Sequence, residues 1–554
     1  MNPFNIKGNL VDCFSRRVTP SAIEVREGKI HSIAPLEGLS PDPSLPFISP
    51  GFIDAHVHIE SSMLVPSAFA RLAVVHGTIA TVSDPHEIAN VCGLEGVRFM
   101  IENGKTVPFK FNFGAPSCVP ATIFETAGDV LDAADVKALL ESDDVKYLTE
   151  MMNFPGAIAG DPQVLEKIAS AHALGKPVDG HAPGLMGDGL RTYVGRGIST
   201  DHECFTIEEA REKLGMGMKI IIREGSAAKN FDALIPLIQD HPDMIMFCSD
   251  DKHPDSLVEG HINQLCARAV KEGYDVFNIL QAACINPVQH YKLDVGLLKV
   301  GDPADFILLE NLQDFKVLQT FIDGQQVANN GKSLIGAHEP VTGKVSGHQS
   351  INRFGIGKIN VEDLKMEGEG KYGFPVIGCL DGQLITEKLV LQPKWMDGEW
   401  CSNLDHDVLK IVVVNRYHKA PIAKAFIHRF GLKSGAIASS VAHDSHNIVA
   451  IGVDDESLVS AINLVIEAKG GVSCVGNGTE SILALPIGGL MSADDGYDVA
   501  NAYTLIDRSA KDLGSTLSAP FMSLSFMALL VIPHVKLSDK GLFDGDGFGI
   551  FNEG

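Results

Sequence analysis

Between residues 51 and 300, short apolar runs alternate with longer stretches whose apolar residues recur at helical spacing. The repeat is roughly thirty residues long, which favours parallel strands joined by crossover helices. Eight such runs predict a (β/α)8 barrel, with a doubly wound sheet as the alternative. The predicted strands are residues 50–60, 78–84, 108–113, 145–150, 177–181, 197–203, 219–224 and 244–250. Helical spacing is found at 129–142, 162–174 and 256–272.

The two segments that flank this repeat have a different texture, with short β-like runs separated by turns. Within residues 1–50, runs at 22–25 and 30–33 are separated by a turn at Glu27 and Gly28, which predicts a hairpin. A similar texture returns in residues 301–345. We therefore expect one small β-sandwich assembled from both flanks of the barrel.

The pattern changes again at residue 346, after a glycine-containing linker. We expect residues 346–554 to form a separate C-terminal α+β domain. Its predicted strands are 409–414, 435–441 and 448–452, and its predicted helices are 421–430 and 455–469. The longest apolar stretch, 521–535, is interrupted by serine, proline and histidine. That interruption favours a buried strand or helix over a membrane span.

Composition removes several classes of function. A formal net charge of -25 and a pI near 5.2 argue against nucleic acid or an anionic membrane as partner, because both require basic surfaces. The ten cysteines are scattered without any Cys-x-x-Cys, which is typical of core thiols in a reducing compartment. The first residues lack a charged leader followed by an apolar stretch, so a cytoplasmic protein is expected.

Candidate chemistry begins on the first predicted barrel strand. Side chains on a strand alternate between its two sides, so Asp54, His56, His58 and Glu60 are expected on one face. Two imidazoles spaced two residues apart can hold one cation, although a single His-x-His is weak evidence for a metal.

Further ligand-type residues fall at the ends of later predicted strands, namely Glu150, His181, His202 and Asp250. The carboxyl ends of barrel strands meet on one face, where active sites lie. Any one of these residues alone is more often a helix cap or a turn residue. Together with His56 and His58 they predict a site for one or two divalent ions.

These motifs resemble the amidohydrolase superfamily, whose signature Pro-Gly-Phe-Ile-Asp-x-His-x-His is present at 50–58. Within that superfamily they are similar to the members that deaminate adenine. The matching segments are 56–62, 83–90, 150–156, 179–184, 200–203, 248–251 and 439–447. The resemblance implies a homodimer and a binuclear centre of Mn²⁺ or Fe²⁺ ahead of Zn²⁺, with Glu150 as the bridging carboxylate. Histidine and carboxylate ligands by themselves accept all three metals.

The activity implied by the resemblance is hydrolysis of adenine to hypoxanthine and ammonia in purine salvage. A metal ion lowers the pKa of bound water to about 7, so hydroxide is available to attack C6. Asp250 is expected to take the water proton and pass it to the departing amine, and Glu203 is expected to contact N1. One alternative is another amidohydrolase, acting on a different heterocycle or a cyclic amide. A second is a catalytically inactive scaffold that keeps the barrel for assembly; loss of ligands marks such proteins, and none of the six is missing here.

Five more residues are expected to face the substrate or to support the ligands: Glu60, His86, Glu87, Asp251 and His253. Glu60 completes a His-x-Glu that also occurs in zinc nucleotide deaminases, but their Pro-Cys-x-x-Cys is absent. Residues 84–87 are equally consistent with a simple helix start. The cluster His443 to His446 could cap the barrel mouth or form a solvated turn.

Overall fold

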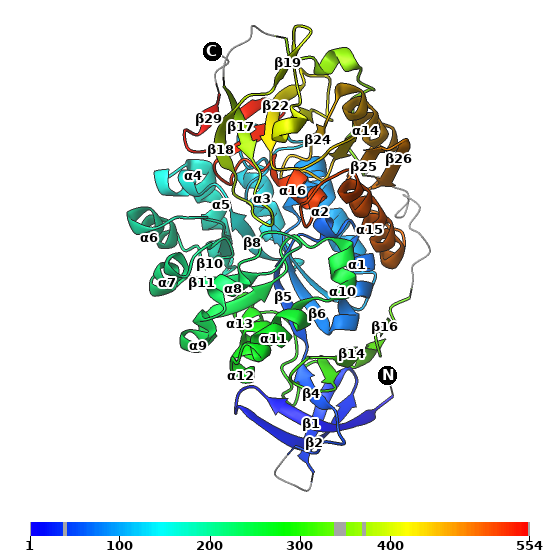
Figure 1. Cartoon of the computed structure of the whole chain (residues 1–554). Coiled ribbons are helices and arrows are strands. Elements are labelled where there is room, and N and C mark those ends of the chain that lie inside the picture. Colours follow the sequence, from blue (N-terminus) through cyan, green and yellow to red (C-terminus); the bar gives the residue numbers. More distant parts are fainter. Residues whose placement is uncertain (1, 37–40, 337–350, 368–372, 552–554) are drawn as a thin grey trace.

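The computed structural model describes residues 2–36, 41–336, 351–367 and 373–551, and its centre is a barrel of eight parallel strands (Figure 1). Five strands form one sheet and three form another. In chain order they are β5 (Phe52–Val57), β6 (Thr78–Ser83), β7 (Lys110–Ala115), β8 (Val145–Met151), β9 (Val178–Gly180), β10 (Thr200–Asp201), β11 (Lys219–Arg223) and β12 (Ile245–Cys248). The predicted barrel strands are therefore all present, each close to its expected position.

Single bridges join the two sheets on both sides. Val178 pairs in parallel with Ile198 just before β10, and Val57 pairs in parallel with Asp250 just after β12. Backbone hydrogen bonds run from the His58 amide to the Asp250 carbonyl (3.2 Å) and from the Asp250 amide to the His56 carbonyl (3.0 Å). Closure of the barrel thus brings the first and last predicted metal-binding strands side by side.

The strands are buried on both faces, as parallel strands covered by helices must be. Every residue of β5 and β6 is buried. Gly51 directly precedes β5, and a Cβ at this position would lie only 2.5 Å from Ile79, so the close approach of the two strands requires glycine. The predicted helices appear as α3 (Ala133–Leu140), α5 (Pro162–Ala173), α10 (Pro254–Glu259) and α11 (Ile262–Lys271). The third predicted helix is divided at Gly260, whose φ of 167° ends α10.

Both flanks of the barrel enter one eight-stranded sheet, in the order β16-β15-β14-β13-β4-β1-β2-β3. Its strands are β1 (Phe4–Asp12), β2 (Arg17–Arg26), β3 (Lys29–Pro35), β4 (Phe47–Pro50), β13 (Phe306–Leu309), β14 (Val317–Ile322), β15 (Gln325–Asn329) and β16 (Lys332–Ser333). The hairpin predicted at Glu27 and Gly28 joins β2 to β3. The Phe4 and Phe321 rings stack at 5.9 Å although two strands separate β1 from β14, so the sheet curls around its own apolar core. The expected sandwich is therefore a single continuous sheet with facing halves.

The C-terminal domain contains a second eight-stranded sheet, in the order β18-β17-β22-β21-β24-β23-β25-β26. Its strands are β17 (Phe374–Gly378), β18 (Glu387–Leu391), β21 (Val408–Val414), β22 (Ala423–His428), β23 (Ala436–Ser439), β24 (Ile448–Gly452), β25 (Gly471–Gly476) and β26 (Thr479–Ala484). Helix α14 (Asp455–Ala468) covers one face. Val412 and Val414 pack on that side, whereas Ile411 and Val413 belong to the core shared with the barrel. The expected boundary at 345/346 lies outside the described residues.

One predicted helix of this domain is wrong. Residues 421–430 were expected to be helical, but they form strand β22, which pairs with β21 on one side and β17 on the other. Its alanines favour a helix in isolation, and pairing on both edges outweighs that weak preference. The apolar stretch from 521 contains helix α16 (Pro520–Phe526), which is buried throughout. None of the helices in the described ranges combines the length and apolar character that crossing a bilayer requires.

The flanking sheet and the C-terminal domain lie at opposite ends of the barrel (Figure 1). The C-terminal domain meets the carboxyl ends of the strands, where Leu64 bridges to Ser492 and the Asn447 side chain donates to the Thr126 carbonyl (3.0 Å). The predicted chemistry therefore lies beneath this domain.

Candidate metal centre

The His-x-His pair lies where β5 ends. The Nε2 atoms of His56 and His58 face each other at 3.1 Å, and both side chains are buried. The strand ends at Val57, however, and the chain turns into a 3-10 helix over Ile59–Ser62. Glu60 is therefore not on the strand face with the two histidines, contrary to the sequence expectation, because the local 3-10 bonds replace the strand ladder there.

Two backbone and side-chain contacts fix the orientation of this pair. Nδ1 of His58 donates to the Asp84 carbonyl (3.2 Å), which leaves Nε2 free to act as a ligand. Asp54 accepts hydrogen bonds from the Ser249 amide (2.9 Å) and meets Nε2 of His261 at 2.7 Å. Asp54 thus ties β5 to the end of β12, and its carboxylate is directed away from the histidine pair.

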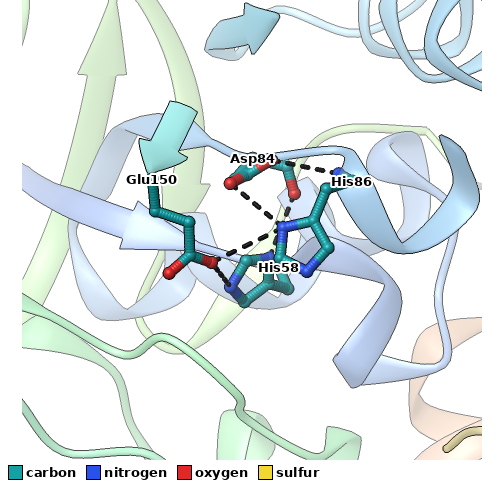
Figure 2. Close-up of side chains that lie close together, drawn as sticks. All are labelled: His58, Asp84, His86 and Glu150. Atoms are coloured by element: carbon teal, nitrogen blue, oxygen red, sulfur yellow. Dashed lines mark hydrogen bonds and ion pairs between the residues drawn. The ribbon is translucent and has the colours of Figure 1, made fainter. Parts of the chain in front are cut away.

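Glu150, at the carboxyl end of β8, lies between two groups of histidines. Its Oε1 is 3.3 Å from His58 Nε2, while its Oε2 is 2.6 Å from His181 Nδ1 and 3.2 Å from His202 Nε2. Figure 2 shows the first of these contacts. One carboxylate with each oxygen directed at a different imidazole group has the geometry needed to bridge two cations.

Asp250 joins the first group. Its Oδ1 lies 3.2 Å from His58 Nε2 and 3.6 Å from His56 Nε2. Its Oδ2 accepts a hydrogen bond from Nη1 of Arg223 at 2.6 Å. Burial alone would raise the pKa of Asp250, but the Arg223 guanidinium and the surrounding histidines hold it well below its usual range.

Glu203 lies beside the second group and also binds Arg223. Nη1 of Arg223 contacts Oε1 of Glu203, and Nη2 donates to Oε2 at 3.0 Å. The same Oε1 is 3.6 Å from His181 Nδ1 and 3.5 Å from His202 Nε2. Arg223 was not among the sequence predictions, although its position at the end of β11 is the strand-end signal that identified the others.

The residues present fit a pair of divalent ions. His181 Nε2 and His56 Nδ1 are buried without a hydrogen-bond partner among the described residues. Burial lowers the pKa of an imidazole, yet Glu150 and its neighbours raise that of His202 to about 9. The cluster therefore attracts positive charge, and its nitrogen and oxygen donors suit divalent transition metals. All six predicted ligands lie close together at the barrel mouth.

Asp84 and His86 extend the cluster from the end of β6 (Figure 2). Oδ2 of Asp84 is 3.1 Å from Nδ1 of His86, and that nitrogen is 3.5 Å from Oε1 of Glu150. His86 is also the first residue of α2 (His86–Gly104), so the helix start and the site coincide. Asp84 was not predicted, because sequence gave no reason to rank it above an ordinary helix-capping residue.

The other expected substrate-facing residues surround this centre at different distances. Oε1 of Glu60 accepts from the Ile88 amide (3.1 Å), and burial raises the pKa of Glu60 to about 7. Oδ1 of Asp251 accepts from the Ser61 hydroxyl at 2.5 Å. His253 packs its ring against Tyr503 of α15 (Gly496–Asp512), with centroids 4.6 Å apart, on the side of the C-terminal domain.

Residues 443–446 reach this centre from the C-terminal domain. Both imidazoles, of His443 and His446, contact the carboxylate of Glu87, and Nε2 of His443 lies 3.5 Å from Oδ1 of Asp251. All four residues are buried. The solvated-turn interpretation is therefore wrong, because the segment is enclosed between the barrel and its own domain.

Comparison with known proteins extends over the whole chain. The Amidohydrolase family matches residues 47–327, and the Adenine deaminase C-terminal domain matches residues 383–549. A protein of Sulfurovum sp. (strain NBC37-1) named adenine deaminase is 54% identical over 98% of both chains. Proteins of that name from Salinibacter ruber and Methanosarcina mazei are 55% identical over 98% of each chain and 50% identical over 97% of each chain. The chain belongs to the adenine deaminase family.

Within the adenine deaminase family match, the centre described above draws on both parts of the chain. The six predicted ligands fall inside the amidohydrolase match, and His443 to His446 fall inside the match to the C-terminal domain. The candidate site of this adenine deaminase family member is therefore composite, with the barrel supplying the six predicted ligands and the C-terminal domain enclosing them.

Proposed function

We propose that this protein hydrolyses adenine to hypoxanthine and ammonia, in purine salvage. The observation that carries the proposal is the convergence of four histidines and two carboxylates at the barrel mouth, in a chain about half identical over its full length to proteins named adenine deaminase. We further propose a cytoplasmic homodimer. The ten cysteines, all free and eight of them buried, are consistent with a reducing compartment.

The proposed metal set is binuclear. One ion would be held by His56, His58 and Asp250, the other by His181 and His202, with Glu150 between them. Mn²⁺ or Fe²⁺ is proposed ahead of Zn²⁺. When bound, such ions supply a water whose pKa is lowered to about 7. The chain's own residues then have to orient the purine, exclude bulk water and move two protons.

Asp250 is proposed to carry the first proton. Its Oδ2 is occupied by Arg223, so Oδ1, on the histidine side, would serve both as the ligand atom and, through its second lone pair, as the acceptor of a proton from the attacking water. Arg223 stabilises the ionised carboxylate, which is the form that a base needs. The same oxygen would then deliver the proton to the departing amine at C6.

Glu203 is proposed to act at N1 of the purine. Its two carboxylate oxygens both contact Arg223, which holds the side chain in place beside the second histidine group. The residues proposed to border the purine are Glu60, His86, Glu87, Asp251 and His253. All are buried, which agrees with a site that excludes water around a small flat base.

Ammonia release from a panel of purines, pyrimidines and hydantoins tests the proposal. Adenine is expected to be the best substrate of the metal-loaded protein, with hypoxanthine as the product. Turnover of a cyclic amide with none of adenine would overturn the substrate assignment.

Asp250→Asn is expected to lose more than about tenfold in activity, since one general acid–base group contributes about 100- to 10,000-fold. Retention of activity within that range, with metals still bound, would contradict the role of Asp250.

A further inference from the structure

A second group of ligand-type side chains lies on the side of His86 that faces the C-terminal domain. It contains His86 and Glu87 from the start of α2 and Asp444 from the C-terminal domain, with His443 and His446 packed behind Glu87. Each of these residues is no more than 3% exposed. None of them is among the six residues proposed for the binuclear centre.

The distances within this group match those around a small divalent ion. Nε2 of His86 lies 3.4 Å from Oε1 of Glu87 and 3.7 Å from Oδ1 of Asp444. A tetrahedral ion with ligands at about 2.1 Å places neighbouring ligand atoms roughly 3.4 Å apart. The three atoms come from two domains, and all lie within 4.8 Å of one another.

His86 supplies an independent indication. Neither of its ring nitrogens has a hydrogen-bond partner within the described part of the chain, although the residue is 98% buried. Its Nδ1 is directed at Asp84 and Glu150, and its Nε2 at Glu87 and Asp444. Buried imidazole nitrogens are normally bonded, so an open Nε2 aimed at two carboxylates calls for a partner of its own.

We propose that His86, Glu87 and Asp444 bind a third divalent cation at the junction of the barrel and the C-terminal domain. One imidazole and two carboxylates form a donor set that suits Zn²⁺, Mn²⁺ or Fe²⁺. His443 and His446 orient Glu87, as supporting groups commonly do for a ligating carboxylate. The ion links α2 to residues 443–446, so it fastens the C-terminal domain over the barrel mouth. The site does not depend on which heterocycle the protein deaminates.

Metal analysis of the full-length protein loaded with Mn²⁺ tests this site, together with anomalous diffraction at the Mn absorption edge. The wild type is expected to hold three ions per chain, with one anomalous peak between His86, Glu87 and Asp444. Asp444→Asn is expected to hold two, because it loses a charged ligand that belongs to this site alone. Ser445→Ala is the matched control: it is a buried neighbour whose hydroxyl accepts from Asn447, and it should keep all three ions.

Two ions in the wild type, with no anomalous peak at this position, would overturn the proposal. The cluster would then consist of protonated imidazoles paired with carboxylates. An unchanged third ion in a folded Asp444→Asn protein would also contradict the ligand assignment. Glu87→Gln provides a second variant with the same expected loss, and the wild-type map decides the matter if both variants fail to fold. The anomalous peaks expected near His56–His58 and near His181–His202 are scored separately. Failure of the binuclear centre can therefore be distinguished from failure of the third site.

Discussion

At the scale of single residues, the centre depends on Arg223 as much as on the groups that sequence predicted. This buried guanidinium contacts two carboxylates, those of Glu203 and Asp250. Loss of one partner from a buried charge pair costs several kcal/mol, because the remaining charge is left uncompensated. Arg223 is therefore expected to set the ionisation of Asp250 and the position of Glu203.

Arg223→Met is expected to raise the pKa of Asp250, since Arg223 is the main group that lowers it. Asp250 must be ionised to accept a proton, so activity is lost as pH falls through this pKa. The acidic limb of the kcat/KM profile should move upward by about 1 to 3 pH units, the usual effect of an adjacent arginine. Arg268→Met removes a partly exposed arginine paired with Glu224 and should leave the profile in place. An unshifted profile in Arg223→Met would contradict this assignment.

His56→Ala is expected to remove one metal ion and to reduce activity to background, because it deletes a proposed ligand. Glu60→Gln should retain both ions, since the Glu60 carboxylate binds the Ile88 amide instead of joining the histidines. Metal content per folded chain distinguishes the two. Loss of metal from Glu60→Gln would mean that Glu60 is itself a ligand.

At the scale of elements, a buried lysine holds together the strand ends that carry two of the ligands. Nζ of Lys213, on α7 (Ile207–Gly215), donates to the Ala182 carbonyl (2.7 Å), to Asp201 (2.9 Å) and to Glu209 (2.6 Å). Ala182 follows His181, and Asp201 precedes His202. The positions of His181 and His202, two of the predicted ligands, thus depend on one helix.

Lys213→Met is expected to lower the free energy of unfolding by about 3–5 kcal/mol, because it leaves two buried carboxylates without their cation. Denaturant unfolding measures the change. Lys105→Met is the control, since its exposed pairs with Glu102 and Asp144 should contribute no more than about 1 kcal/mol. Equal destabilisation by the two variants would show that the buried ion pairs of Lys213 contribute no more to the free energy of unfolding than the exposed pairs of Lys105.

The helices and strands also show which parts of the fold and of the candidate site could be predicted from the sequence. The barrel strands, and the clustering of the six predicted ligands at their ends, were predictable from the sequence. Buried parallel strands appear as apolar runs, and the carboxyl ends of barrel strands meet on one face. Strand β22 was not predictable, since its pairing with β17 and β21 is a tertiary effect absent from its own residues. Nor could sequence reveal that Asp54 turns toward His261, or that Arg223 joins two acids. Those contacts depend on side-chain directions after the barrel closes.

At the scale of the whole molecule, we expect metal binding at the proposed centre to stabilise the folded chain. Any ligand that binds the folded chain alone stabilises it, by about 2.7 kcal/mol per site at a free concentration one hundred times its Kd. Removal of the ions with a chelator should therefore lower the unfolding temperature in calorimetry, and Mn²⁺ or Fe²⁺ should restore it. Mg²⁺, which prefers oxygen ligands, is the control and should restore less. An unfolding temperature indifferent to metal would contradict a centre bound in the folded state.

The pairing of β4 with β13 determines whether the barrel segment can fold without its flanking strands. Pro50 lies opposite Phe306, so the polypeptide enters and leaves the barrel through adjacent strands of the flanking sheet. The two ends of the barrel segment are thus held together by the pairing of β4 with β13. Only Gly51 separates β4 from β5, the strand that carries His56. A fragment of residues 51–300 would lack this strand pairing, and its first strand would no longer be held in place. The barrel is therefore expected to fold only with both flanks attached.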